Sequence, residues 1–334
     1  MRIAVLHPSY EGSTSVFKDY DYDANPAAFY PGHIWDNFHI LKPTAVDQVE
    51  EIVRRDYDMY VQLCDGASDE DRAGVVVVET LERLNVPFTG ADSGFFEPTR
   101  PEMKAACRRA GGLAPAYVMA RTPAGADQAL KRLRFPMLVK HPNSYGSIGL
   151  TRDSRVSDAA GLRRETARMV KQFGAALIEE FIEGREFTVL VAERRRPGEP
   201  AWALPALELV FPAGETFQHM DLKWVHCDCV YARRVTDRTL DGRLRRIAAG
   251  TFAEIEGTGY GRCDFRVDAQ GRIYLLEINP NCALFWENGM HSWVDWLLAT
   301  GPVNHQEFLD HLFVCAHRRC NRAAHAALAS GVHA

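Results

Sequence analysis

The stretch Tyr274-Leu-Leu-Glu-Ile-Asn-Pro-Asn-Cys-Ala-Leu-Phe285 decides how the sequence is interpreted, because two oxygen-bearing side chains interrupt its apolar run. Glu277 and Asn279 are two residues apart, and side chains at that spacing in a β-strand point to the same face of the sheet. A turn at residues 268–271 predicts a hairpin that brings Asp264 roughly opposite Glu277. Two carboxylates and an amide are oxygen ligands suited to Mg²⁺. Polar capping of strand ends is the alternative, and the hairpin alone does not decide between the two.

The composition is that of an ordinary globular protein. The chain has 334 residues, 46% of them hydrophobic and 25% charged, which is long enough for one to three domains with a large core. The net charge of −5 gives no reason to expect nucleic acid or a membrane surface as a partner. The apolar start Met1–Leu6 follows no basic-then-apolar signal segment, and no stretch is long and apolar enough to suggest a membrane span. The predicted compartment is the cytoplasm.

The cysteines follow neither a metal-binding nor a disulfide pattern. The eight are scattered without a Cys-x-x-Cys pair, which argues against a disulfide framework and a structural zinc site. Cys227 and Cys229, with His226 beside them and His219 upstream, offer a set of metal ligands, but reduced and unliganded side chains are the favoured interpretation.

The first hundred residues alternate strand and helix patterns. Short apolar strands are expected at residues 2–6 and 58–64, and helices at residues 46–54 and 74–84. This alternation is the βαβ signature of a doubly wound sheet.

Residues 16–40 do not fit that alternation, because they lack a helical period and are rich in turn formers. Their three alternating aspartates imitate the start of a calcium-binding loop, yet Ala24 and Tyr30 stand where an EF-hand needs Gly and Glu. We therefore exclude an EF-hand, and favour an acidic, aromatic surface loop over a segment that lines a substrate site.

The rest of the chain mixes helices with paired strands. A segment without regular structure is expected at residues 212–235, and a helical tail after the hairpin. Helices are predicted at residues 101–110, 126–133 and 240–256, and strands at 113–120, 135–140, 175–182, 185–194, 201–211 and along the hairpin 263–279.

Lys140 ends an apolar strand, where an ammonium is costly without an anionic partner. The loop that follows, Ser144-Tyr-Gly-Ser-Ile-Gly149, has glycines and hydroxyls whose neighbouring backbone N–H groups suit phosphate oxygens. The glycine patterns of P-loop and Rossmann nucleotide sites are missing from the sequence, so those sites are disfavoured.

The stretch Leu177-Ile-Glu-Glu-Phe-Ile-Glu-Gly-Arg-Glu-Phe187 joins an apolar run to four acids. A linker of this kind can offer backbone groups to an adenine edge and an acid to ribose hydroxyls. An amphipathic edge strand with solvated acids is the alternative.

These features occur in the order helix lysine, lysine followed by a glycine loop, Glu-Glu-Phe-Ile-Glu, and Asp followed by Glu-Ile-Asn. That order resembles the ATP-grasp superfamily, in its D-alanine–D-alanine ligase-like branch, from about Leu84 to Pro280. The resemblance implies an α/β ATP-grasp fold, with an N-terminal doubly wound α/β domain followed by two α+β subdomains that clamp ATP. The expected parts are the N-terminal domain at residues 1–100, a small central lid at 101–180, and a C-terminal subdomain with the metal site at 181–330.

The resemblance also implies roles for individual residues. Asp264, Glu277 and Asn279 would bind two Mg²⁺ ions, with Glu277 bridging them and Mn²⁺ as an alternative ion. Arg262 would lie beside the reacting carboxylate, and Glu11 would bind a substrate ammonium. The α- and β-phosphates would be held by Lys104 and Lys140, the γ-phosphate by Lys223 and the ribose by Glu186. The phosphates would be covered by Gly146, Ser147 and Gly149. The adenine would be framed by Glu179, Glu180, Phe181 and Ile182.

The predicted activity is ADP-forming ligation of a small-molecule carboxylate to an amine. A carboxylate is a poor electrophile, and phosphorylation by ATP produces an acyl phosphate that an amine attacks. A true D-alanine–D-alanine ligase and a non-catalytic ATP-binding regulator are the alternatives. The resemblance further implies a homodimer.

The sequence departs from the ligases immediately after the proposed metal site. Cys282 and Ala283 stand where those enzymes carry Pro-Gly, and Leu284-Phe-Trp286 replaces a run of hydroxyl side chains. We therefore expect a different acceptor pocket. A nucleophilic Cys282 is less favoured than a neutral thiol that lines the pocket, because the sequence shows no base beside it.

Overall fold

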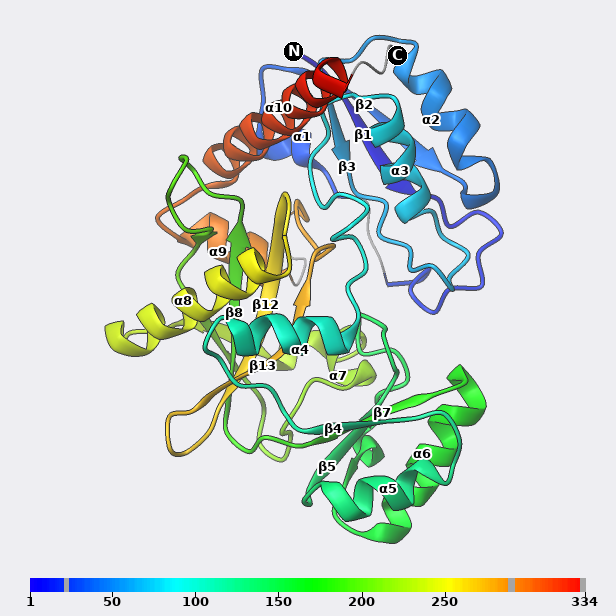
Figure 1. Cartoon of the computed structure of the whole chain (residues 1–334), viewed down its shortest axis with the longest axis vertical. Coiled ribbons are helices and arrows are strands. Elements are labelled where there is room, and N and C mark those ends of the chain that lie inside the picture. The colour runs from blue at the N-terminus through cyan, green and yellow to red at the C-terminus, as the bar shows by residue number, and fades with distance from the viewer. Residues whose placement is uncertain (21–23, 288–291, 331–334) are drawn as a thin grey trace.

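The computed structural model describes residues 1–20, 24–287 and 292–330 and contains three β-sheets in that part of the chain (Figure 1). The first sheet has the strand order β2-β1-β3, all parallel. Its apolar side chains pack against α2 and α3, and the buried residues Ala4, Leu6, Val49 and Val77 lie in one core cluster. The elements are β1 (Arg2–Pro8), α1 (Pro26–Phe29), β2 (Ile34–Ile40), η1 (Lys42–Thr44), α2 (Ala45–Val53), β3 (Met59–Gln62) and α3 (Val75–Arg83).

The prediction that residues 16–40 lack regular structure is wrong for two segments, the short helix α1 and the last seven residues. Ile34–Ile40 forms β2, which pairs in parallel with the whole of β1, from Arg2 opposite Ile34 to Pro8 opposite Ile40. As an edge strand β2 leaves several side chains partly or fully exposed, and therefore lacks the continuous apolar run of a central parallel strand.

The second sheet is small and four-stranded, in the order β4-β7-β5-β6, and two helices cover one of its faces. Its second helix, α6, was not predicted. Asp158 caps it by accepting the Gly161 N–H at 2.7 Å, and Gly174 ends it with φ +74°. Many charged residues hide its narrow apolar stripe in the sequence. The elements are α4 (Arg100–Arg109), β4 (Tyr117–Ala120), α5 (Gly125–Arg132), β5 (Met137–Lys140), η2 (Arg152–Ser154), β6 (Arg155–Val156), α6 (Ala159–Phe173) and β7 (Ala176–Glu180).

The third sheet is antiparallel and carries the predicted hairpin. Its order is β11-β10-β8-β12-β13, with β9 paired to β8, and α4 and α8 pack on one face. Asp264 pairs directly with Glu277 across the hairpin, as predicted, and the register shifts after Asp264. The elements are β8 (Arg185–Ala192), β9 (Trp202–Ala203), β10 (Leu207–Val210), α7 (Met220–Trp224), η3 (Cys227–Cys229), β11 (Tyr231–Arg234), α8 (Arg238–Glu254), β12 (Tyr260–Val267) and β13 (Ile273–Asn279).

The expectation of irregular structure at residues 212–235 is partly wrong. The short helix α7 begins at His219, whose ring accepts the Leu222 N–H at 3.3 Å, and β11 extends the sheet as an edge strand. Both elements are short, and β11 exposes charged side chains, so neither leaves a clear periodic signal.

Two C-terminal helices join the first sheet to the third, and confirm the predicted helical tail. They are α9 (Trp293–Thr300) and α10 (His305–Ser330), and Figure 1 shows α10 running beside the first sheet. Leu297 and Phe308 share one buried cluster with Val5 of β1 and Leu190 of β8. In the described part of the chain, none of the helices is long and apolar enough to span a bilayer.

Replacing Phe308 with Ala should lower the free energy of unfolding by about 3–5 kcal/mol, because its ring is fully buried and packs 6.0 Å from the rings of Trp202 and Tyr260. Urea denaturation measures the change. Val314→Ala on the exposed side of the same helix is the control and should change stability by no more than about 0.5 kcal/mol. Equal effects of the two substitutions would contradict the packing role of α10.

Candidate active site

The hairpin end places two carboxylates next to arginine side chains. Asp264 accepts hydrogen bonds from Thr188 Oγ1 at 2.7 Å and from Arg262 Nη2 at 2.8 Å. Glu277 accepts a hydrogen bond from Arg100 Nη1. Burial tends to raise the pKa of Glu277, but Arg100 and Lys140 outweigh it and lower that pKa to about 2.

The donor set fits a hard divalent cation. Asp264 and Glu277 are opposite each other in the hairpin, and both carboxylates are paired with arginine side chains. Asn279 is buried two residues beyond Glu277 on the same strand, where its Oδ1 accepts the Asn281 N–H at 2.9 Å. Oxygen donors of this kind suit Mg²⁺, whose remaining ligands are usually waters and phosphate oxygens.

The described residues give no support to the alternative metal set around the cysteines. Within the described residues, no group of three or more His, Cys, Asp or Glu side chains is arranged to hold a metal ion. His219 instead lies 3.2 Å from Glu215 and caps α7. The side chain of Cys227 lies outside the described residues.

A buried ion-pair cluster lies behind the hairpin. Glu179 forms ion pairs with two lysine ammonium groups, that of Lys104 at 2.7 Å and that of Lys140 at 2.9 Å. Burial raises the pKa of Glu179, yet the two lysines outweigh it and lower that pKa to about 2. Burial, together with the charge of Lys140, lowers the pKa of Lys104 to about 8. Glu179 therefore positions the two lysines, which differs from the adenine contact predicted for it.

The glycine loop has the backbone shape expected for an anion-binding turn. Gly146, Ser147 and Gly149 all have positive φ, of +68°, +63° and +72°. Ser147 Oγ donates to the Gln218 carbonyl at 2.8 Å, and Trp224 Nε1 donates to the Gly146 carbonyl at 2.8 Å. A Cβ at Gly146 would lie 2.6 Å from the ring of Phe17, so this position requires glycine.

Most predicted ATP contacts line one pocket of about 110 Å³, which we call the nucleotide pocket. Glu186 lies there with its carboxylate 2.8 Å from Arg266 Nη2, and burial raises its pKa. Lys104, Gly146 and Gly149 are outside this lining; Lys104 is buried against Glu179, and Gly146 lines the larger cavity described next. The predicted residues that line it are Lys140, Ser147, Glu179, Glu180, Phe181, Ile182, Glu186, Lys223, Arg262, Asp264 and Glu277.

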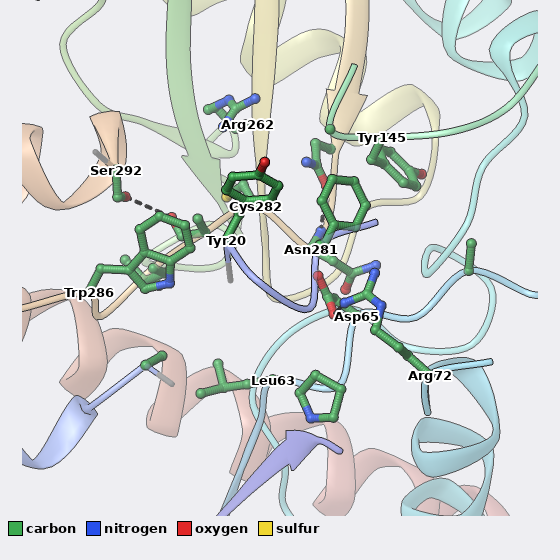
Figure 2. A pocket seen from close by; sticks show the side chains of 18 of the residues that line it. Tyr20, Leu63, Asp65, Arg72, Tyr145, Arg262, Asn281, Cys282, Trp286 and Ser292 are labelled. Carbon is green, nitrogen blue, oxygen red and sulfur yellow. Dashed lines mark hydrogen bonds and ion pairs between the residues drawn. The ribbon is translucent and has the colours of Figure 1, made fainter. Parts of the chain in front are cut away.

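A second and larger cavity of about 380 Å³, which we call the substrate cavity, opens between the first and third sheets (Figure 2). Lys223 and Arg262 line both the substrate cavity and the nucleotide pocket, so the two spaces meet at these cations. Burial and the charge of Arg262 lower the pKa of Lys223 to about 8. Asn279 lines the substrate cavity rather than the nucleotide pocket.

Several cavity residues were missed from the sequence. Arg72 is buried and lies 2.6 Å from both Asp65 and Glu70, and the three line the wall supplied by the first sheet. They follow β3, where side chains at the carboxyl end of a parallel strand meet the ligand crevice. Trp286 lines the opposite wall. The Asp65-Gly66 turn after a predicted strand was the available signal.

The prediction for Glu11 is not supported by its position. Its side chain is exposed and lies outside the lining of both pockets, whereas His7 and Tyr10 of the same segment line the substrate cavity. The chain turns at Gly12, which has φ +71°. The backbone N–H of Glu11 donates to Ser9 Oγ at 3.2 Å. The turn directs Glu11 toward solvent.

The preference for a surface loop at residues 16–40 is wrong for the aromatic residues near its start. Phe17, Tyr20 and Ala24 line the substrate cavity, and the rings of Phe17 and Trp224 lie 5.0 Å apart. Asp71 accepts hydrogen bonds from Ser13 Oγ and the Thr14 N–H, both at 2.7 Å, and so ties this segment to the loop before α3. Residues 21–23, two of whose aspartates entered the calcium-loop comparison, lie outside the described residues.

Cys282 lines the substrate cavity as a buried thiol. Burial raises its pKa to about 12, although the nearby Arg262 opposes the shift. A thiol with this pKa is protonated at neutral pH, which supports the interpretation as a neutral wall residue.

Residues 115–285 match the family described as D-ala D-ala ligase C-terminus. The D-alanine--D-alanine ligase of Xanthomonas axonopodis pv. citri (strain 306) is 28% identical over 234 residues, which cover 68% of this chain and 70% of that protein. The D-alanine--D-alanine ligase of Laribacter hongkongensis (strain HLHK9) is 32% identical over 202 residues, covering 60% of this chain and 62%, less than two thirds, of that protein.

The crystal structure of D-alanine--D-alanine ligase from Bacillus anthracis complexed with ATP superimposes with a TM-score of 0.71 and 18% identity. The superposition covers 96% of this chain and 99% of that one. This likeness confirms the predicted ATP-grasp fold.

Replacing Glu179 with Gln should lower the free energy of unfolding by about 3–5 kcal/mol at neutral pH, because it leaves two buried ammonium groups without their carboxylate. Urea denaturation measures the change. Glu180→Gln on the same strand is the matched control, since a glutamine oxygen can still accept the Arg134 N–H that Glu180 accepts at 3.0 Å. Unchanged stability of the Glu179 variant would contradict the buried cluster.

The affinity for ATP should fall as the pH rises through about 8, because Lys223 loses its proton in that range and only the protonated ammonium attracts phosphate. Isothermal titration calorimetry between about pH 7 and about pH 9 measures the fall. Lys223→Arg keeps its charge over this range and should show a smaller fall; an equal fall in both proteins would exclude Lys223 as its source.

Proposed function

The chain belongs to the D-ala D-ala ligase family and has the ATP-grasp fold, and from this premise we propose that it is an ATP- and Mg²⁺-dependent carboxylate–amine ligase. It would join an amino acid to another amino acid or amine and release ADP and phosphate. The observation that carries the proposal is the junction at Lys223 and Arg262, where the nucleotide pocket opens into a separate cavity large enough for organic substrates.

The first chemical step is phosphoryl transfer from ATP to a carboxylate. Lys140 and Lys223 line the nucleotide pocket and would contact the triphosphate, while Arg262 would orient the carboxylate at the junction. Asp264, Glu277 and Asn279 would hold Mg²⁺, which when bound offsets the charge of the phosphate oxygens. The side chain of Arg100 keeps Glu277 ionised and in place.

The second step is attack of an amine on the acyl phosphate, and it requires that water be kept out. Phe17 from the first sheet's loops and Trp224 from α7 both contact the glycine loop at Gly146. These contacts close the space between the substrate cavity and the glycine loop, which supports a role in shielding the intermediate.

D-alanine as both substrates is the second candidate, and the names of the related proteins favour it. The segment after β13 argues against it, because Leu284 and Trp286 line the cavity where those ligases carry hydroxyl side chains, and Cys282 lines it where they carry Pro-Gly. A direct assay with D-alanine and ATP decides between a D-alanine ligase and a ligase of other amino acids.

ADP release should require a carboxylate and an amine together, and mass spectrometry over pairs of amino acids should detect an amide product. If a carboxylate alone consumes ATP and a stable phosphorylated product accumulates, the protein is a kinase. Tight ATP binding without turnover for any pair would instead favour a non-catalytic regulator.

Glu277→Gln should lower the rate of ADP release by about a hundredfold or more, because it removes one of the carboxylates that would hold Mg²⁺ beside the phosphates. A coupled assay for ADP measures the rate, and circular dichroism checks that the variant is folded. Glu307→Gln, whose carboxylate pairs with the exposed Arg195 far from both pockets, is the control and should keep the wild-type rate. Normal turnover in the Glu277 variant would remove the metal assignment.

A further inference from the structure

We propose that one of the two substrates carries an aromatic ring, which the outer part of the substrate cavity binds. This inference rests on the proposed ligase function, and concerns the part of the cavity beyond the junction with the nucleotide pocket. The carboxylate that accepts the phosphoryl group must lie at that junction, beside Lys223 and Arg262. The space farther out must therefore hold the remainder of that substrate or the amine that attacks it.

The cavity is larger than two small amino acids require. Its volume of about 380 Å³ falls within the range of about 300–1,000 Å³ typical of pockets for drug-sized ligands. A dry apolar cavity of about 150 Å³ already binds benzene. The space therefore accommodates a ring in addition to the backbone atoms of an amino acid.

Aromatic side chains from distant parts of the chain line this space. Phe17 and Tyr20 come from the segment after β1, Trp224 from α7, and Trp286 and Trp293 from the segment after β13. Figure 2 shows Tyr20, Cys282 and Trp286 on one side of the cavity and Asp65 and Arg72 on the other. Offset or edge-to-face contacts with such walls favour a planar ring over an aliphatic side chain of similar size.

The wall that carries Trp286 is held in place by a buried carboxylate. Asp295 accepts the Phe285 N–H at 2.8 Å and the Trp286 N–H at 2.9 Å. The ring of His305 lies 2.9 Å from the same carboxylate, and the Ser292 hydroxyl caps the helix that carries it. Because its backbone is fixed by these bonds, Trp286 is a preformed part of the wall.

The part of the wall formed by Phe17, Tyr20 and Trp224 is fixed as well. Phe17 is buried between Gly146 and Trp224, and its ring approaches Gly146 so closely that a Cβ there would lie 2.6 Å away. Tyr20 lies 6.4 Å from Trp224, ring to ring. The wall opposite Trp286 also carries charge, because the guanidinium of Arg72 lies 5.5 Å from the centre of the Phe17 ring.

The test compares phenylalanine, leucine and alanine in each substrate position, as both enantiomers, with kcat/KM for ADP release as the readout. We expect a phenylalanine-containing pair to exceed the matching alanine pair by about tenfold or more, as discrimination by an apolar pocket allows. Comparing phenylalanine as carboxylate donor with phenylalanine as amine acceptor identifies the position that takes the ring. Alanine or leucine used as well as phenylalanine in both positions would overturn the proposal while leaving the ligase function in place.

Substitutions in the wall test whether Trp286 causes the preference for phenylalanine. Trp286→Ala should reduce the ratio of phenylalanine to alanine kcat/KM toward one, and Trp286→Phe should retain most of it because a ring remains. Trp296→Ala removes a partly exposed tryptophan of α9 that is not part of the cavity lining, and should leave the ratio unchanged. An unchanged ratio in Trp286→Ala would show that Trp286 does not cause the preference, and would contradict the proposed contact between its ring and the substrate.

Direct binding separates a failure of this inference from a failure of the ligase proposal. If none of the pairs releases ADP, the ligase proposal fails, and calorimetry with a non-hydrolysable ATP analogue still compares phenylalanine with alanine. Tighter binding of phenylalanine by about tenfold would support the ring site without turnover. Equal binding of the two amino acids would overturn it.

Discussion

The structure depends on the burial of opposite charges at one end of the third sheet. Glu179 holds Lys104 and Lys140, Asp264 holds Arg262, and Glu277 holds Arg100. An isolated charge at these depths would be costly, and each pair reduces that cost only when both partners are in place. The nucleotide pocket is lined by five lysine or arginine side chains and by five carboxylates, so its charges balance.

This charge cluster also explains how distant segments come together. Arg100 begins α4, Lys140 ends β5, Glu179 belongs to β7, and Glu277 lies on β13. Lys104 of α4 pairs with Glu179 of the small sheet, and Arg100 at the start of the same helix pairs with Glu277 of the large sheet, so these ion pairs connect the two sheets through α4. The apolar cluster that contains Val5 and Phe308 packs the first sheet against α10. The substrate cavity lies where all three parts meet, whereas the nucleotide pocket is lined by residues between 100 and 277 and lies between the small sheet and the large one.

The elements missed from the sequence share a physical cause. β2 is an edge strand, α6 exposes a charged face, and α7 with β11 is too short for a period to emerge. Their conformations are stabilised mainly by neighbours that the local sequence does not reveal. The long βαβ elements and the hairpin were predicted correctly, since their apolar periods extend over several residues.

The sequence by itself predicted which side chains meet at the end of the hairpin. Asp264, Glu277 and Asn279 were identifiable because strand alternation and a short turn are local properties, which set the register of a hairpin before any tertiary contact forms. The pairing of Glu179 with two lysines and the aromatic walls built by Phe17 and Trp286 were decided only by the tertiary structure. Those features depend on segments that are distant in the chain meeting in space, and packing at such distances leaves no periodic signal in a single chain.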